Sequence, residues 1–447
     1  MRAFLRRFFG ARTVQLFLLA FLVYNANLRS VTSLDTYPTR FLPISIIRER
    51  DLDLDEFPFL HRYPEWWHSD RKHEFPYYLT FSRGHYMSTY PVMPAILSVP
   101  VYLIPVVAGL PEIGVAVSGY NGVEIVATFL SKLSASLAVA LSVPLVYLAA
   151  LHLSSRRAAL WAALVYALGT SSWSVSSQGL WQTAMSQPLV ALALYLLVRG
   201  RTHPWSVAVA GVPLALAVAS RYSTAVMAAI LAAYVFRYHR NQFRWFALFP
   251  AVLAILLLAY NLYHFAAPVH MGPANLLRAL DWRAFLGLVV SPGRGMLIYS
   301  PVLVFAFLPL LDGHLRRDPL LKAIGIATVA TILLYSAWER WDAAFSYSYR
   351  FLVDLLPGLA LYLAIALQTV LARRPLAVTF FGLTAVSVLV QIVGAFFYPC
   401  GWYETPVSAA LVPSRFWDWT DLEVIRCLRN GPVEAEGWRL LTALLRR

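Results

Sequence analysis

Charged residues are scarce in this chain, which excludes an ordinary soluble domain. The 447 residues are 59% hydrophobic and only 13% charged, whereas a typical soluble domain carries about 25% charged residues. The mean hydropathy is +0.60. This composition predicts an all-α polytopic membrane protein.

Lysine is almost absent, so the net charge of +14 comes mainly from arginine. Lysine occurs only at positions 72, 132 and 322, so nearly all the positive charge is arginine. The arginines form short clusters between apolar segments rather than one continuous basic face. That pattern argues against nucleic-acid binding and is typical of the cytoplasmic loops of membrane proteins.

Several catalytic motifs are missing, and cysteine is rare. The chain has no G-x-S-x-G elbow, no G-x-G-x-x-G loop and no Walker sequence, so nucleotide-driven transport has no support. The two cysteines, Cys400 and Cys427, both lie near the C-terminus. If that part of the chain faces an oxidising compartment, we expect them to form a disulfide; two unpaired thiols are the alternative.

Eleven apolar segments are predicted to span the membrane. They lie at 13–30, 123–151, 157–174, 182–199, 205–219, 222–236, 244–264, 298–312, 319–337, 351–371 and 376–398. Arginines precede the first segment and no small-residue cleavage site follows it. We therefore expect a retained signal-anchor whose N-terminus is cytoplasmic.

The basic clusters support this orientation, because each of them follows an even-numbered segment. They are Arg156-Arg157; Arg199 and Arg201; Arg237, Arg240 and Arg244; Arg316, Arg317 and Lys322; and Arg373-Arg374. By the positive-inside rule these loops are cytoplasmic. The sequence thus predicts a transmembrane module over 1–398 and a small extracytoplasmic tail over 399–447, in a multi-pass protein of the bacterial inner (plasma) membrane.

The first outer loop is long, covering about 31–122, and carries two predicted interfacial helices. Residues 41–50 are expected to form a helix lying on the membrane surface. The apolar segment 91–109 is expected to dip into the membrane, because a full span there would invert every later loop. Spans five and six are short, about 15 residues each. They predict a hairpin whose tip, at 220–222, stays below the outer surface.

Asp35 is the best-placed candidate for catalysis, because it stands just after the first span at the water edge of the bilayer. The acidic run 51–56 is interpreted as a solvated turn. Metal binding has little support in the sequence. Histidines and an acid recur in the first outer loop, but their spacings match no ligand motif; they are Glu65, His68, His73 and His85. A divalent metal stays possible, and no cofactor is certain.

Three arginines on the predicted outer side are candidates for binding a phosphate: Arg221, Arg294 and Arg350. Arginine at bilayer depth costs about 2.5–3.5 kcal/mol on insertion scales, so it tends to be paired or functional. Its planar fork suits a phosphate. The alternatives are snorkelling to lipid headgroups, or pairing with the acids Glu339, Asp342 and Asp354.

The order of these features resembles that of the GT-C superfamily of integral membrane glycosyltransferases. This superfamily includes the protein O-mannosyltransferases and the aminoarabinose transferases of lipid A. The resemblance covers roughly residues 13–400. It rests on the acid after span one, the long outer loop with Gly84-His85-Tyr86-Met87-Ser88-Thr89-Tyr90-Pro91, the short fifth and sixth spans with Arg221 between them, and Ser348-Tyr349-Arg350-Phe351-Leu352 ahead of Leu355-Leu356-Pro357.

The resemblance implies an inverting transfer of a sugar from a polyprenyl-phosphate donor to an acceptor hydroxyl on the outer face. Asp35 matches the family's first-loop acid, and Arg221 matches its phosphate-contacting residue. We assign Arg350 and Arg294 to the same phosphate and expect five further residues to bind substrate: His85, Tyr90, Gln178, Trp181 and Tyr347. One departure stands out. Many relatives carry a second acid where this chain has Gln178, which can hydrogen-bond a sugar but cannot act as a base.

Other functions stay open at the level of sequence. A transporter or flippase for lipid-linked substrates would favour ionisable residues near the midplane and inverted repeats, and neither is evident. A non-catalytic membrane scaffold would explain the missing second acid but leaves the outer arginines without a purpose. The expected partners are the lipid-linked donor, a glycan, lipid or protein acceptor, and membrane lipids.

Overall fold

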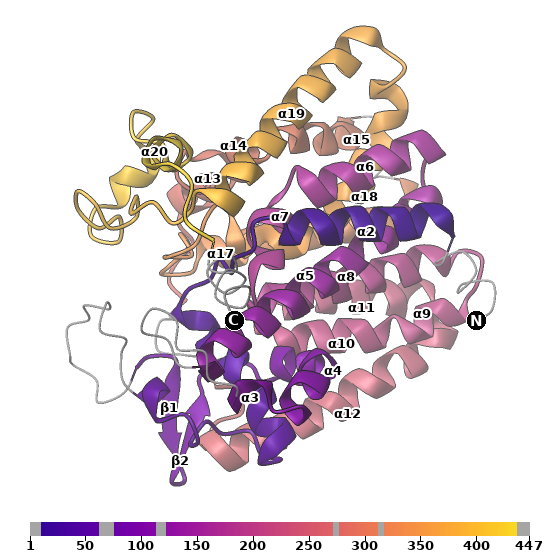
Figure 1. Ribbon diagram of the computed structural model, residues 1–447. Helices are drawn as coiled ribbons and strands as arrows, with labels where there is room; N and C mark the ends of the chain where they lie inside the picture. The colour runs from indigo at the N-terminus through magenta and orange to yellow at the C-terminus, as the bar shows by residue number, and fades with distance from the viewer. Residues whose placement is uncertain (1–9, 62–75, 113–121, 271–276, 312–316, 436–447) are drawn as a thin grey trace.

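The computed structural model describes residues 10–61, 76–112, 122–270, 277–311 and 317–435. Within these ranges the chain is mostly helical (Figure 1). The α-helices are α2 (Ala11–Asn25), α3 (Tyr37–Arg48), α4 (Met93–Val107), α5 (Gly122–Leu151), α6 (Arg156–Leu168), α7 (Ser171–Ser174), α8 (Gln182–Arg199), α9 (Trp205–Val209), α10 (Gly211–Ser220), α11 (Ala225–Tyr238), α12 (Arg240–Phe265), α13 (Trp282–Val290), α14 (Met296–Tyr299), α15 (Leu308–Leu311), α17 (Pro319–Ser336), α18 (Leu356–Val370), α19 (Arg374–Phe396) and α20 (Glu423–Asn430).

Short 3₁₀ helices and one β-hairpin complete the described elements. The 3₁₀ helices are η1 (Leu34–Thr36), η2 (Pro58–His61), η3 (Leu110–Glu112), η4 (Ser176–Gln178), η5 (Tyr222–Thr224), η6 (Pro301–Phe307), η7 (Arg350–Leu355) and η8 (Pro413–Trp417). The strands β1 (Leu79–Ser82) and β2 (His85–Ser88) pair antiparallel. The predicted all-α class is confirmed.

Among the described residues, five helical segments are long and apolar enough to cross a membrane, and they make this an integral multi-pass protein. They are α5, α12, α17, η7 with α18, and α19. Their burial differs with position: α5 and α18 are mostly enclosed by other helices, whereas α12 and α19 expose most of their apolar side chains. Such exposure suits contact with lipid. All eleven predicted segments contain helix, while their number as spans stays a prediction.

The predicted helix at 41–50 is present, but the prediction that it lies on the surface is wrong, because most of it is buried. The corresponding helix, α3, starts earlier, and its residues 38–45 are buried against α4 and α5. Arg40 is buried with them. Its guanidinium donates to the hydroxyls of Thr32 at 2.9 Å and Thr128 at 3.0 Å. These threonine partners could not be predicted from the sequence pattern. Their hydrogen bonds allow α3 to pack inside the protein with the charge of Arg40 buried.

The helix break predicted near residue 220 is present. α10 ends at Ser220, Arg221 is extended (φ −154°, ψ 105°), and η5 leads into α11. A residue in this conformation cannot continue the helical hydrogen-bond ladder, so Arg221 lies between two helix ends. The break therefore places a charged side chain inside the helical bundle.

The β-hairpin is formed by a local turn signal in the long first loop. Arg83 and Gly84 join the strands with φ values of +53° and +89°, as a two-residue turn with positive φ at both positions requires. Glycine adopts such a conformation without steric cost. Figure 1 shows the hairpin and α20 on the same side of the long helices.

A compact C-terminal cluster packs near the loop that precedes η7. Cys400 and Cys427 form a disulfide, as we expected of the two cysteines. Trp402 and Phe416 are buried beside it, in the same apolar cluster. The described part of the tail is thus anchored by a covalent link and an aromatic core.

Candidate active site

A cavity of about 300 Å³ brings together Asp35, Arg221 and Arg350. These residues are far apart in the sequence, and they come from η1, the α10–η5 break and the start of η7. Tyr90 and Trp181, two of the expected substrate-binding residues, line the same cavity. Its size is at the lower end of the range for ligand sites.

Asp35 accepts hydrogen bonds on both carboxylate oxygens. The hydroxyls of Tyr77 and Tyr90 donate to Oδ1 at 2.8 and 3.1 Å, and Nη1 of Arg350 donates to Oδ2 at 2.9 Å. Burial raises the pKa of both tyrosines well above the ordinary 10, and the adjacent Asp35 charge adds to this. The tyrosines therefore stay protonated as donors. A carboxylate offers about four acceptor positions, so three partners leave one for an incoming hydroxyl.

Local structure explains why these groups converge. The hairpin holds Tyr77 and Tyr90 together, since they flank its two strands and Thr89 donates to the Tyr77 carbonyl at 2.9 Å. The segment before Asp35 packs tightly on η4. A Cβ added to Gly179 would lie 2.2 Å from Thr32 Cγ2, so this close approach requires glycine.

Arg350 links the acid to the rest of the cavity. Besides Asp35, it donates through Nη2 to the Ala343 carbonyl at 3.0 Å, and its guanidinium lies 4.4 Å from the centroid of the Trp181 ring. Its Nε is buried and has no hydrogen-bond partner among the described residues. Arg350 is therefore held in place at the wall of the cavity.

Arg221 forms a second, deeper ion pair in this region. Its Nη1 lies 2.6 Å from Oδ2 of Asp354, and the two side chains are only 7% and 4% exposed. The rings of Tyr335 and Phe351 lie 5.3 and 5.6 Å from the guanidinium. Arg340 also lines the cavity and pairs with Asp342 at 3.1 Å. Three arginines thus line one cavity, each paired with an acid.

Gln178 is placed differently from our expectation. It is fully buried and does not line the cavity. Its Oε1 accepts from Asn27 at 2.7 Å and from Lys132 at 2.6 Å, and its Nε2 donates to the Trp173 carbonyl at 2.7 Å. The amide oxygen and nitrogen of Gln178 therefore hold η4 in place. We no longer assign Gln178 to binding a sugar.

Tyr347 and His85 also lie outside the cavity. Tyr347 is buried and donates to the Val390 carbonyl at 2.8 Å. His85 is exposed on β2 and contacts Asp53 and Asp55. Neither residue is brought to Asp35.

Arg294 is separated from the other two arginines by its own partners. It is 1% exposed and pairs with Glu423, which is equally buried, at 3.0 Å. It also donates to the carbonyls of Asp342, Gly293 and Ala344. This arrangement fixes the C-terminal cluster, so we remove Arg294 from the proposed phosphate ligands.

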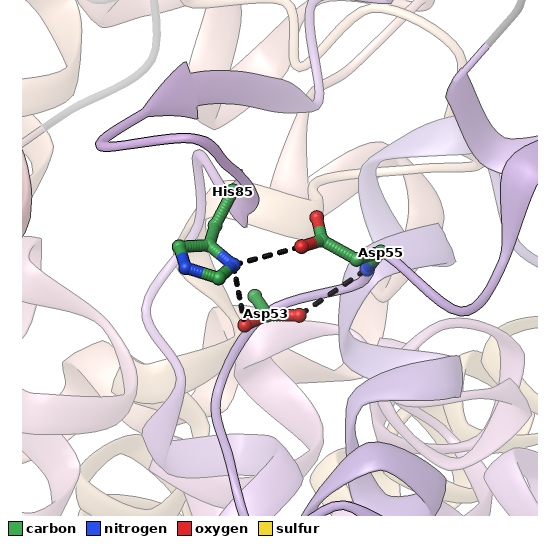
Figure 2. Close-up of side chains that lie close together, drawn as sticks. All are labelled: Asp53, Asp55 and His85. Atoms are coloured by element: carbon green, nitrogen blue, oxygen red, sulfur yellow. Dashed lines mark hydrogen bonds and ion pairs between the residues drawn. The ribbon is translucent and has the colours of Figure 1, made fainter.

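In the described part of the chain, one group could hold a metal ion, and it lies beside the hairpin rather than in the cavity (Figure 2). His85 Nδ1 is 2.8 Å from Asp55 Oδ2 and 3.2 Å from Asp53 Oδ2. The hydrogen bond to Asp55, and then the charge of Asp53, raise the pKa of His85. A protonated imidazole accounts for this cluster without an ion. Three other candidate ligands, Glu65, His68 and His73, lie outside the described residues.

The structure adds residues that our sequence interpretation did not assign to the site. They are Tyr77 and His270, and neither lies in a sequence pattern that indicates a site. His270 lines the cavity, and burial lowers the pKa of its imidazole. Asp354 is one of the three acids that the sequence offers as possible partners for the arginines.

Comparisons with known proteins add evidence on the fold. No family model matches the chain, and no curated protein matches it. An oligosaccharyltransferase of Archaeoglobus fulgidus, solved with a tethered acceptor peptide, aligns with a TM-score of 0.50 and 14% identity, over 98% of this chain and 57% of its own. The chain thus spans little more than half of that protein.

Two further structures show weaker likeness. ArnT from Cupriavidus metallidurans, bound to undecaprenyl phosphate, aligns with a TM-score of 0.48 and 13% identity, over 96% of this chain and 76% of its own. Oligosaccharyltransferase AglB from Archaeoglobus fulgidus was solved with an inhibitory peptide and dolichol phosphate. It aligns with a TM-score of 0.47 and 12% identity, over 87% of this chain and 56% of its own. Identities this low concern the fold alone. On that level, the chain shares its fold with the Archaeoglobus fulgidus oligosaccharyltransferase, in keeping with the resemblance noted from the sequence.

Proposed function

We propose that this protein is an inverting glycosyltransferase that moves a sugar from a polyprenyl-phosphate donor to an acceptor hydroxyl. Asp35 is the base, and Arg221 and Arg350 bind the phosphate. The observation that carries the proposal is one cavity lined by a hydrogen-bonded carboxylate and by both arginines assigned to the phosphate. Tyr90 and Trp181 line it beside them and would contact the sugar or the acceptor.

The chemistry balances with these residues alone. The acceptor oxygen attacks the anomeric carbon, the bond from that carbon to the phosphate oxygen breaks, and Asp35 takes the hydroxyl proton. The bonding electrons leave with the phosphate, which gains one negative charge while Asp35 loses one. Arg350, relieved of its charged partner, can then turn its full charge toward the leaving phosphate.

The cavity also suits a lipid-linked donor. Arg221 and Arg350 are arranged around one space, and arginine binds phosphate through paired donors. Since the basic loops are expected in the cytoplasm, we place this cavity on the extracytoplasmic side. The donor then arrives from the bilayer, and the acceptor from the aqueous compartment.

Transfer in reconstituted liposomes tests the assignment. Purified protein would be supplied with undecaprenyl-phosphate sugars of several types and with extracts containing glycan, lipid or protein acceptors. We expect product formation by the wild type and a loss of at least about 100-fold in Asp35→Asn, the scale of general-base contributions. Glu404→Gln makes the same chemical change at an exposed site and should keep full activity.

Two results would count against this function. Undiminished transfer by Asp35→Asn would exclude Asp35 as the base. Movement of intact lipid-linked sugar across the membrane, with no transfer, would instead favour a flippase.

A further inference from the structure

We infer that Asp354 is an internal counter-ion that competes with the lipid phosphate for Arg221 and so limits how tightly the product is held. This inference rests on the proposed function, since it concerns the phosphate site of the same cavity. It gives the site a means of releasing its product, by an acid that takes no part in the proton transfer.

The geometry fixes Asp354 against Arg221. Oδ2 accepts from Nη1 of Arg221 at 2.6 Å, and Oδ1 accepts from the Ser186 hydroxyl at 2.6 Å. Asp354 is 3% exposed, and Ser186 is fully buried. Held at both oxygens, the carboxylate cannot turn away when a ligand enters.

Arg221 is also contacted by two aromatic rings, which stack on each other with centroids 4.6 Å apart. Tyr335 and Phe351 lie within 5.6 Å of its guanidinium and also line the cavity. The guanidinium therefore has one fixed anion, Asp354, and faces a cavity in which a second anion would bind. A cation shared between two anions binds each of them less tightly than it would bind one alone.

Asp35, which lines the cavity, and Asp354, which contacts it only through Arg221, differ in what the reaction does to them. Asp35 gains a proton during transfer and loses its hold on Arg350. Asp354 is buried away from the acceptor, keeps its charge, and stays paired with Arg221. After transfer, Arg350 is thus the stronger ligand of the lipid phosphate. The charge of Arg221 is still neutralised by Asp354, so Arg221 binds the phosphate less tightly and favours release of the product.

Replacing Asp354 with asparagine tests this directly. Asn keeps the size of the side chain and can still accept from Arg221 and bond Ser186, but it removes the charge. We expect Asp354→Asn to bind undecaprenyl phosphate about tenfold more tightly, within the range of coupling between contacting groups. Turnover should fall, because product release slows, while the KM for the donor falls as well.

A purely structural role for Asp354 predicts the opposite. Misplacing Arg221 would weaken binding of undecaprenyl phosphate and raise the KM. Weaker or unchanged binding by Asp354→Asn therefore overturns the inference. Glu404→Gln, which removes an exposed charge elsewhere, should leave binding unchanged.

A second pair of variants covers the case in which Asp354→Asn fails to fold, since removing one partner of a buried ion pair is often destabilising. Arg221→Gln leaves the carboxylate alone, and Arg221→Gln with Asp354→Asn removes both charges. We expect the double variant to bind undecaprenyl phosphate several-fold more tightly than Arg221→Gln. Equal or weaker binding by the double variant would contradict the inference.

The same measurements separate the inference from the function beneath it. If the wild type binds neither undecaprenyl phosphate nor dolichyl phosphate, the proposed function fails and the inference fails with it. If the wild type binds the lipid and transfers sugar, but the Asp354 variants do not bind more tightly, only the inference is overturned.

Discussion

Asp35 depends on its neighbours for orientation as much as on its position within η1. Two tyrosine hydroxyls hold Oδ1, and an arginine holds Oδ2. Because both oxygens accept hydrogen bonds, the carboxylate has one orientation. The same donors fix the direction of its remaining acceptor position. Positioned donors of this kind lower the cost of reaching a reactive geometry.

Removing either tyrosine hydroxyl tests this orientation. A hydrogen bond to a charged group contributes about 1.5–3 kcal/mol. We therefore expect Tyr77→Phe and Tyr90→Phe each to lower kcat by about tenfold in the liposome assay, with little change in the amount of folded protein. Tyr238→Phe, at an exposed position near the end of α11, is the matched control. Full activity in both cavity variants would show that Asp35 needs no such support.

Helices and their ends decide which charged residues meet. The apolar segments and the break at Arg221 could be predicted from the sequence, because hydrophobicity and short spans are local signals. The partners of each arginine could not. Arg294 and Arg221 are both predicted to lie on the outer side, yet one pairs with the C-terminal Glu423 and the other with Asp354. Only tertiary packing brings those acids close.

The same limit applies to Gln178 and Tyr77. Gln178 lay where relatives have an acid, so a contact with sugar was the natural expectation. Its partners, Asn27 and Lys132, come from distant segments and bury it. Tyr77 reaches Asp35 only because the hairpin folds back, and its register depends on the turn at Arg83 and Gly84.

The buried pair of Arg294 and Glu423 yields a prediction about stability rather than catalysis. Removing one partner of a buried pair costs about 3–5 kcal/mol, whereas replacing both with apolar residues is often tolerated. We expect Arg294→Met to lower the melting temperature markedly and Arg294→Met with Glu423→Leu to restore much of it. Both should retain wild-type turnover per folded molecule. Thermal unfolding and transfer assays would check this, and a specific loss of donor binding would return Arg294 to the phosphate site.

The whole molecule is expected to place its cavity on the side opposite the basic clusters. Both cysteines form a disulfide, so the wild type offers no thiol among its cysteines for labelling. A single cysteine introduced at an exposed site can therefore report its side of the membrane.

Thiol labelling tests this orientation. A membrane-impermeant maleimide should label Glu404→Cys in intact cells or spheroplasts, and should label Arg157→Cys only after permeabilisation. Arg157 lies at the start of α6, within a predicted cytoplasmic cluster, and Glu404 is exposed in the C-terminal region. The reverse pattern would place the cavity in the cytoplasm and exclude an extracytoplasmic acceptor.

The most direct test of the central claim is a structure of this protein, in nanodiscs, with undecaprenyl phosphate. The account predicts a phosphate between Arg221 and Arg350, within reach of Asp35, and its loss in Arg221→Gln but not in Arg237→Gln at the far end of α11. A phosphate bound elsewhere, with this cavity unchanged, would contradict it.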